Sequence, residues 1–153
     1  MRRIIFILSS IALLTACGGN NRQQQEAEDL LAQASTLYEQ GNYPEAKASI
    51  DSLRKRYPNA IDARKKALKL GWGIELKEAQ GELAVTDSLL QLVQHDYDNL
   101  QAKVEKDKAA LRATPDELTM LTRTRMKRDS LRTQCETLGV KIRYIRKKQA
   151  GDQ

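Results

Sequence analysis

Apolar residues recur at intervals of three and four in residues 26–57, which is the spacing of one face of an α-helix. The pattern is interrupted at Gly41 and resumes after Pro44, whose missing N–H suits the first turn of a helix. The repeating positions are Ala27, Leu30, Leu31, Ala34, Leu37, Tyr38, Ala46, Ile50, Leu53 and Tyr57. The pattern therefore predicts two antiparallel helices joined by a short turn.

A third helical segment begins near Asn59 and passes through Gly71-Trp72-Gly73. Each Gly costs about 1 kcal/mol relative to Ala inside a helix. The apolar phase nevertheless continues across the glycines, at Ile61, Leu68, Trp72, Leu76, Ala79 and Leu83. The shared phase predicts one helix through this segment.

Beyond Leu76 the apolar period becomes seven residues, which is typical of a coiled coil. One row is Leu76, Leu83, Leu90, Tyr97, Val104 and Leu111, and the other is Ala79, Thr86, Val93, Leu100 and Asp107. The pattern stops before Thr114, which can cap a new helix with Pro115 in its first position and Glu117 completing a capping box. We therefore expect a turn near residues 113–116.

The returning helix carries two matching rows, Leu121, Arg128, Cys135 and Ile142, and Thr124, Leu131, Leu138 and Ile145. In an antiparallel hairpin the numbers of facing residues have a nearly constant sum, and both rows satisfy this condition. Tyr97 is thereby predicted to face Arg128. Charge favours the same pairing, since residues 74–112 have five basic and eight acidic side chains, whereas residues 117–148 have ten basic and three acidic ones.

The first sixteen residues have a different pattern. Arg2 and Arg3 precede an apolar run from Ile4 to Leu14, and small residues follow it. This order is typical of a leader for export. The run is too short for a membrane span, which needs roughly 20 apolar residues.

The segment Leu14-Thr15-Ala16-Cys17 resembles the lipobox of bacterial lipoproteins. The resemblance implies cleavage between Ala16 and Cys17. Cys17 would then begin the mature chain and carry a diacylglyceryl group and an amide-linked acyl chain. No cofactor other than this covalent lipid is expected. An ordinary signal peptide followed by a free thiol is the alternative.

The residue after the lipidated Cys bears on the destination of a lipoprotein. In many bacteria an Asp at this position causes retention in the inner membrane, and here it is Gly18. By this resemblance we expect the outer membrane. Some lineages use an acidic cluster behind the Cys for export to the cell surface, but Gly-Gly-Asn-Asn follows Cys17. We therefore expect the protein to face the periplasm.

Residues 27–60 resemble a tetratricopeptide repeat at Ala34, Leu37, Gly41-Asn42-Tyr43, Ala46, Ile50 and Pro58. Two positions depart from the family pattern, since Gln33 is usually apolar and Leu53 is usually small. One repeat cannot bury its own faces, because such solenoids need about three units. The third helix, a partner protein or a second copy would have to cover it. An ordinary helical hairpin is the alternative.

The patterns together predict an all-α fold, in which a tetratricopeptide-like hairpin is followed by a long antiparallel two-helix coiled-coil hairpin. The expected parts are a leader (1–16), a lipidated flexible tether (17–25), a helical base (26–73), the hairpin (74–148) and a disordered tail (149–153).

Composition and candidate chemistry point away from catalysis. Loss of Arg2 and Arg3 with the leader leaves 24 basic and 20 acidic side chains. This small excess does not require an anionic polymer as a partner, and export also argues against nucleic acid.

Cys135 lies on a core row and is left without a disulfide partner once Cys17 is lipidated. His95 and its neighbouring acids face different sides of a helix. No metal-ligand spacing, phosphate-binding loop or nucleophile motif is found, and we expect no enzyme and no metal site.

Two basic clusters are candidate surfaces for anionic lipid, namely Arg54-Lys55-Arg56 and the set Arg143, Arg146, Lys147 and Lys148. Solvated charge is the alternative for both, and the second cluster could also balance the acidic helix.

The favoured function is a membrane-anchored, non-enzymatic adaptor of the cell envelope that binds a partner protein. A self-associating structural spacer and a factor that binds anionic lipid through a basic helix are the alternatives. A small hydrolase lacks candidate residues. The expected partners are the membrane, through the lipid, and proteins, among which a second copy of the chain stays open.

Overall fold

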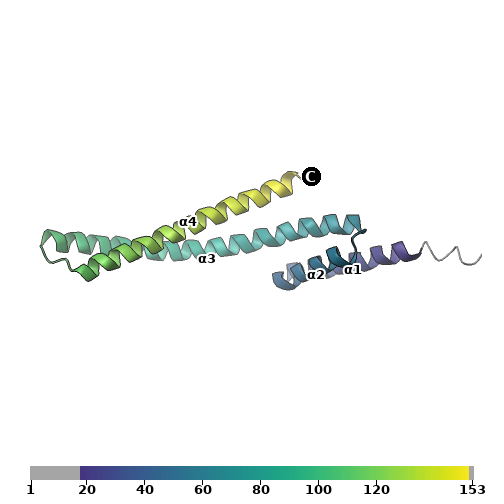
Figure 1. Ribbon diagram of the computed structural model, residues 1–153, viewed down its shortest axis with the longest axis horizontal. Helices are drawn as coiled ribbons and strands as arrows, with labels where there is room; N and C mark the ends of the chain where they lie inside the picture. The colour runs from purple at the N-terminus through teal and green to yellow at the C-terminus, as the bar shows by residue number, and fades with distance from the viewer. Residues whose placement is uncertain (1–17, 152–153) are drawn as a thin grey trace, which may run out of the picture. The chain divides into compact units, whose positions relative to one another are not determined.

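The computed structural model describes residues 18–151, and helices make up nearly all of this range (Figure 1). In chain order the helices are α1 (Gly18–Glu39), α2 (Tyr43–Arg56), α3 (Ile61–Ala109) and α4 (Pro115–Gly151). No strand occurs among the described residues, so the predicted all-α class is confirmed. The described residues divide into two compact units, residues 18–74 (unit 1) and residues 75–151 (unit 2), and α3 contributes to both.

In unit 1 the turn between α1 and α2 forms where Gly41 interrupts the pattern. Gly41 has a φ of 76°, a left-handed conformation that glycine adopts without steric cost. The N–H of Asn42 donates to the carbonyl of Leu37 at 2.8 Å, and that of Gly41 to the carbonyl of Tyr38 at 3.0 Å. These bonds satisfy carbonyls at the end of α1. Pro44 lies in the first turn of α2, as predicted.

The core of unit 1 is built from small residues, which let three helices approach closely. Its fully buried alanines are Ala27, Ala34, Ala46, Ala63 and Ala67. Larger members of the same cluster are Leu31, Ile50, Leu53 and Ile74. The buried apolar positions of α1 and α2 belong to the predicted apolar faces, and Ser49 is buried beside them.

The predicted face of the third helix is wrong at its start. Ile61 is 61% exposed, and the buried residues of α3 in unit 1 are Ala63, Ala67 and Ile74. They follow a different row with the same helical period, in which small side chains allow close packing. The Cβ of a residue placed at Gly73 would lie 3.6 Å from the hydroxyl oxygen of Tyr38, which again indicates a close approach to α1.

Helix α3 continues through Gly71-Trp72-Gly73, as the shared apolar phase predicted. The helix runs from Ile61 to Ala109 without a break. The cost of the glycines is therefore outweighed by packing on both sides of them.

Unit 2 contains the predicted antiparallel hairpin of α3 and α4. Its buried residues all belong to the predicted rows: Ala79, Thr86, Val93, Val104, Leu138, Ile142 and Ile145. The predicted register is confirmed at one layer, where the guanidinium carbon of Arg128 lies 4.1 Å from the centroid of the Tyr97 ring.

The prediction that Leu111 belongs to a core row is wrong, because Leu111 is 95% exposed. Helix α3 ends at Ala109, and Leu111 adopts a φ of 55° in the turn that follows. The next N–H, that of Arg112, donates to the carbonyl of Asp107 at 2.7 Å. This arrangement closes the end of α3 and turns Leu111 away from α4.

Helix α4 begins with the predicted capping box. The backbone N–H of Glu117 donates to the hydroxyl oxygen of Thr114 at 3.2 Å, and the N–H of Thr114 donates to the carboxylate of Glu117 at 3.0 Å. Two donors that the helix cannot satisfy internally are thus paired. Pro115 occupies the first helical position.

The predicted tether and tail differ from the structure. Residues 18–25, expected to be flexible, form the start of α1, where Arg22 donates to Glu26 at 3.0 Å and Gln25 to Asp29 at 3.1 Å. Such pairs four residues apart support a helix that lacks an apolar face. At the other end, α4 extends to Gly151 rather than to residue 148, and Lys148 in its last turn complements the helix dipole. The predicted leader and Cys17 lie outside the described residues.

Candidate interaction surfaces

The first predicted basic cluster forms the last turn of α2. Arg54, Lys55 and Arg56 are all exposed there. Cations at this end of a helix interact favourably with its dipole, so part of their role is local. The start of α3 adds further cations to the same region, so the helix dipole alone does not account for its charge.

The end of α2 is fastened to α1 by a hydrogen bond that the sequence pattern did not predict. The hydroxyl of Tyr57 donates to the carboxylate of Glu26 at 2.9 Å. This bond, with a second from Arg22, lowers the pKa of Glu26, and the same bond raises the pKa of Tyr57. Next to it, the ammonium of Lys66 on α3 lies 3.1 Å from Glu28. Tyr57, which directly follows α2, and Lys66 of α3 thus contact α1 within its first half.

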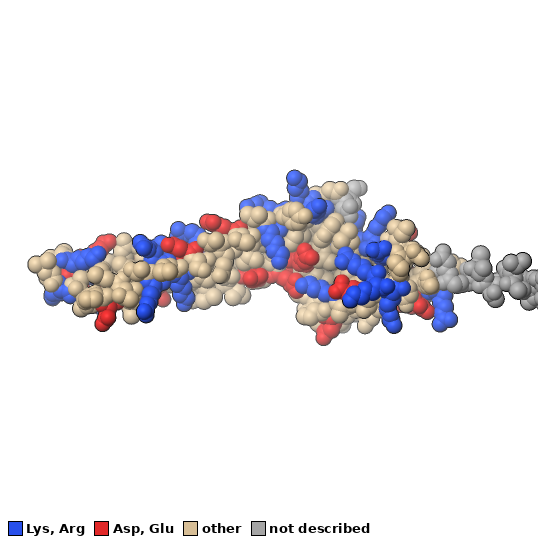
Figure 2. All heavy atoms as spheres, in the orientation of Figure 1, with Lys and Arg blue, Asp and Glu red and all other residues tan. Residues whose placement is uncertain are grey.

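A pocket of about 410 Å³ opens between the end of α2 and the start of α3. We call it the basic pocket, and it is lined by Arg54, Ile61, Arg64, Lys65 and Leu68. Arg64 is oriented by a bond from its guanidinium to the carbonyl oxygen of Pro58 at 2.7 Å. Figure 2 shows Lys and Arg side chains gathered over unit 1.

The sequence predicted Arg54 as part of a basic surface, but it did not point to Arg64 or Lys65, which line the same pocket. The run of three cations Arg64-Lys65-Lys66 could have indicated the pocket, since it begins three residues after Ile61, the first residue of α3. Its meaning depends on the packing of α3 beside α2, which brings cations ten residues apart in sequence to one pocket.

The second predicted basic cluster belongs to unit 2. Arg143, Arg146, Lys147 and Lys148 are exposed on the last turns of α4. The ammonium of Lys148 lies 5.5 Å from the centroid of the Tyr144 ring. Within residues 18–151 none of the four forms an ion pair, so pairing with acids of α3 does not account for them.

Unit 2 also exposes an apolar stripe on α3. Val85, Leu89 and Leu92 are 64%, 43% and 65% exposed, and their spacing of four and three places them on one side of the helix. Asp96, Asn99 and Lys103 continue the same spacing toward the turn. A side chain row of this kind resembles a second coiled-coil seam without a helix against it.

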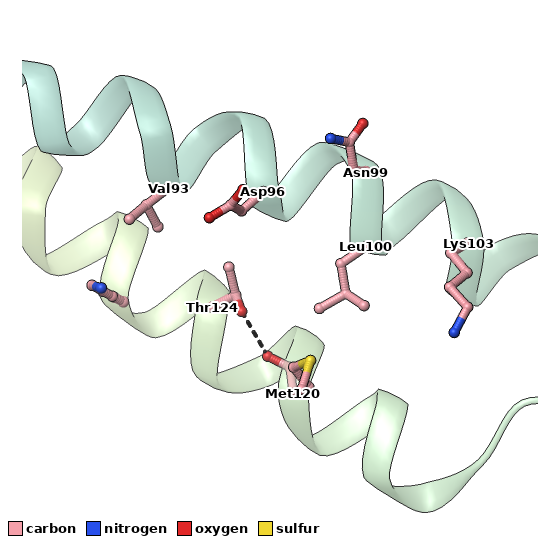
Figure 3. A pocket seen from close by; sticks show the side chains of 8 residues that line it. Val93, Asp96, Asn99, Leu100, Lys103, Met120 and Thr124 are labelled. Atoms are coloured by element: carbon pink, nitrogen blue, oxygen red, sulfur yellow. Dashed lines mark hydrogen bonds between the residues drawn. The ribbon is translucent and has the colours of Figure 1, made fainter.

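The stripe leads into a groove of about 450 Å³ between α3 and α4, which we call the hairpin groove. In Figure 3 Val93 and Leu100 point from α3 toward α4, and Thr124 donates its hydroxyl to the carbonyl of Met120. The lining residues are Val93, Asp96, Asn99, Leu100, Lys103, Met120, Thr124 and Lys127. The groove combines aliphatic side chains with charged and amide groups at its rim.

The remaining candidates for chemistry are scattered. His95 contacts the amide of Asn99 at 3.2 Å, and Cys135 is a half-buried free thiol on its core row. No group of three or more His, Cys, Asp or Glu side chains in residues 18–151 could hold a metal ion. Nor is any helix in the described part of the chain both long and apolar enough to cross a membrane.

Comparison with known families identifies the class of protein from its first residues. The model for a prokaryotic membrane lipoprotein lipid attachment site matches residues 1–17 and ends on Cys17. The match supports a membrane-anchored lipoprotein of the cell envelope. No curated protein and no solved structure matches the chain.

Proposed function

We propose that this lipoprotein is a non-enzymatic adaptor that holds a partner protein at the membrane through its helical hairpin. The observation that carries the proposal is the apolar stripe of Val85, Leu89 and Leu92. These three aliphatic side chains stay exposed although neighbouring rows on the same helix are buried. A partner helix laid along the stripe would bury them and continue into the hairpin groove.

The location proposed for the adaptor is the outer membrane, facing the periplasm. Gly18 stands where an inner-membrane retention signal would have Asp, and no acidic residue occurs before Glu26. The tetratricopeptide-like character of residues 27–60 is part of the same proposal. It is supported by the close packing of Ala34 and Ala46 in the observed hairpin. Helix α3 covers one face of that hairpin, so a second repeat is not needed there.

Site-specific photocrosslinking in cells tests the adaptor role. A photocrosslinkable amino acid in place of Leu89 or Leu92 should give a defined covalent product with one envelope protein. The same amino acid in place of Asp87 or Gln91, exposed neighbours on another side of α3, serves as the matched control. Equal products from all four positions would contradict binding at the stripe.

A variant that lacks the exposed apolar side chains completes the experiment. Val85→Gln, Leu89→Gln and Leu92→Gln together replace the exposed apolar surface by residues that also favour helices. With the crosslinker moved to Met120 in the hairpin groove, this variant should lose the product. A product of twice the mass of the chain would instead support the self-associating spacer and overturn the adaptor.

A further inference from the structure

We propose that the basic pocket of unit 1 binds the phosphate headgroup of an anionic lipid in the same bilayer that holds the Cys17 lipid. The inference is independent of the adaptor role, since the stripe and the hairpin groove belong to unit 2. It assigns to residues of α2 and α3 a contact with the membrane surface, in addition to the covalent anchor.

The path of the chain places the pocket near the anchored end of α1. Cys17 directly precedes Gly18, the first residue of α1. Because α2 returns antiparallel to α1, its last turn and the start of α3 come back toward that end, as the bonds from Tyr57 to Glu26 and from Lys66 to Glu28 demonstrate (Figure 1). Glu26 is eight residues beyond Gly18, which is roughly 12 Å along a helix. The pocket is therefore held within reach of the headgroups.

The charge around the pocket is strongly one-sided. From residue 54 to residue 69 one side chain, Asp62, is acidic, and seven are basic: Arg54, Lys55, Arg56, Arg64, Lys65, Lys66 and Lys69. Among the described residues, neither Arg54 nor Lys65 forms an ion pair. Two arginines and one lysine line one concave site, and guanidinium and ammonium groups are donors that bind phosphate well.

The apolar part of the pocket favours a lipid over a soluble anion. Ile61 is 61% exposed beside the cations, and Leu68 lines the same pocket. At a bilayer surface the cations can contact phosphate while an aliphatic side chain enters the region just below the headgroups. A free phosphate ion would leave Ile61 in water. The acyl chains at Cys17 also raise the local concentration of lipid, so a weak site suffices.

Vesicle flotation of the mature chain carrying Cys17→Ser measures this contact without the covalent lipid. Binding to phosphatidylcholine vesicles that contain phosphatidylglycerol should exceed binding to pure phosphatidylcholine. In Arg54→Gln/Arg64→Gln/Lys65→Gln the partition coefficient should fall on the order of 100-fold, because each cation near an anionic surface contributes about fivefold. The exposed triple Arg123→Gln/Arg125→Gln/Lys141→Gln has the same net charge and should change it by less than about fivefold.

Two further variants distinguish the loss of pocket contacts from a loss of folding and from a change of net charge. Arg54→Gln/Lys65→Gln keeps the bond of Arg64 to Pro58, so it preserves the fold even if the triple variant does not, and should lower binding on the order of 30-fold. Ile61→Ser should lower vesicle binding on the order of tenfold without changing net charge.

Three results would overturn the proposal. Equal losses in the pocket and control triples would assign binding to net charge alone. Unchanged vesicle binding of Ile61→Ser, combined with displacement by inorganic phosphate, would indicate a site for a soluble anion. Tighter binding of the protein to an acidic peptide than to the vesicles would assign the pocket to a protein partner.

Discussion

The guanidinium carbon of Arg128 lies 4.1 Å from the centroid of the Tyr97 ring, inside a core row of the hairpin. The Arg128 side chain is 14% exposed, and its guanidinium donates to Asp129 at 2.7 Å and 2.9 Å. A charged group is therefore held in a layer that the heptad pattern reserves for apolar residues. The cation-π contact and the bonds to Asp129 offset part of its desolvation.

Arg128→Leu should increase the free energy of unfolding by about 1 kcal/mol, because an apolar residue in this layer avoids the desolvation of a charge. Urea unfolding of the mature chain with Cys17→Ser measures the effect. Arg125→Leu, at an exposed position on the same helix, should give no such increase. A loss of stability in Arg128→Leu would mean that the cation-π contact outweighs the cost of burial.

The hairpin could be predicted from the sequence because its pattern is long and its two rows must match. Seven-residue spacing through Leu83, Leu90 and Val104 fixes the face, and the pairing of Tyr97 with Arg128 follows from the constant sum. The capping box could also be predicted, since it depends on Thr114 and Glu117 alone. Local rules and long repeats were sufficient for both.

Features that depend on tertiary packing were not predicted. Ala63 and Ala67 bury little apolar area, so the larger Ile61 dominated the periodic pattern although it lies outside the core. The basic pocket depends on Arg54 and Arg64 meeting across two helices. Such a juxtaposition has no periodic signal in the chain.

Thr114→Ala should lower the free energy of unfolding of the hairpin by about 1 kcal/mol, the usual cost of losing a helix cap. The variant removes the hydroxyl that accepts from the N–H of Glu117 at 3.2 Å. Thr114→Ser keeps this acceptor and should be nearly neutral. Thr119→Ala, whose hydroxyl donates back to Pro115 within the helix, tests a hydroxyl that caps nothing. Equal effects of Thr114→Ala and Thr119→Ala in urea unfolding would rule out the cap as the cause.

The carboxylate of Glu117 should make the stability of the hairpin depend on acid pH. The ammonium of Lys103 and the backbone N–H of Thr114 both donate to it, and they lower its pKa from 4.5 to about 2. The bonded form is the charged one, so its contribution is fully present above pH 4.5 and is lost as the pH falls toward 2. Lys103 sets the alkaline limit of this contribution. Because the bond to Glu117 raises the pKa of Lys103 above 10.5, the contribution is present below pH 10.5 and is lost as the pH rises through the raised pKa.

NMR titration of the Glu117 carboxyl carbon and urea unfolding across this pH range test the dependence. The stability difference between the wild type and Glu117→Gln should shrink between pH 4.5 and about 2. Lys103→Gln removes the largest cause of the shift and should raise the pKa of Glu117 toward 4.5. A Glu117 midpoint that is unchanged in Lys103→Gln would exclude this ion pair as the cause.

Ala67→Leu should destabilise unit 1 by about 1–3 kcal/mol, because overpacking a closely packed core forces its neighbours apart. The side chain of Ala67 is fully buried within the cluster formed by α1, α2 and α3. Ala84→Leu makes the same change at an exposed position of α3 and should cost little. Thermal unfolding followed by circular dichroism gives both values. Equal stability of the two variants would argue against close packing at Ala67.

Cys17→Ser should abolish metabolic labelling with a fatty acid and release the protein from the membrane, because the lipid attachment site ends on this residue. Two or more acyl chains make anchoring stable, whereas no helix among the described residues could replace them as a span. Helix content and thermal unfolding should not change, since the core of unit 1 begins only at Ala27. Cys135→Ser, which removes the other thiol, should keep the label and the membrane fraction. Lipid labelling that persists in Cys17→Ser would locate the anchor elsewhere, and a loss of folding would show that the start of α1 depends on the anchor.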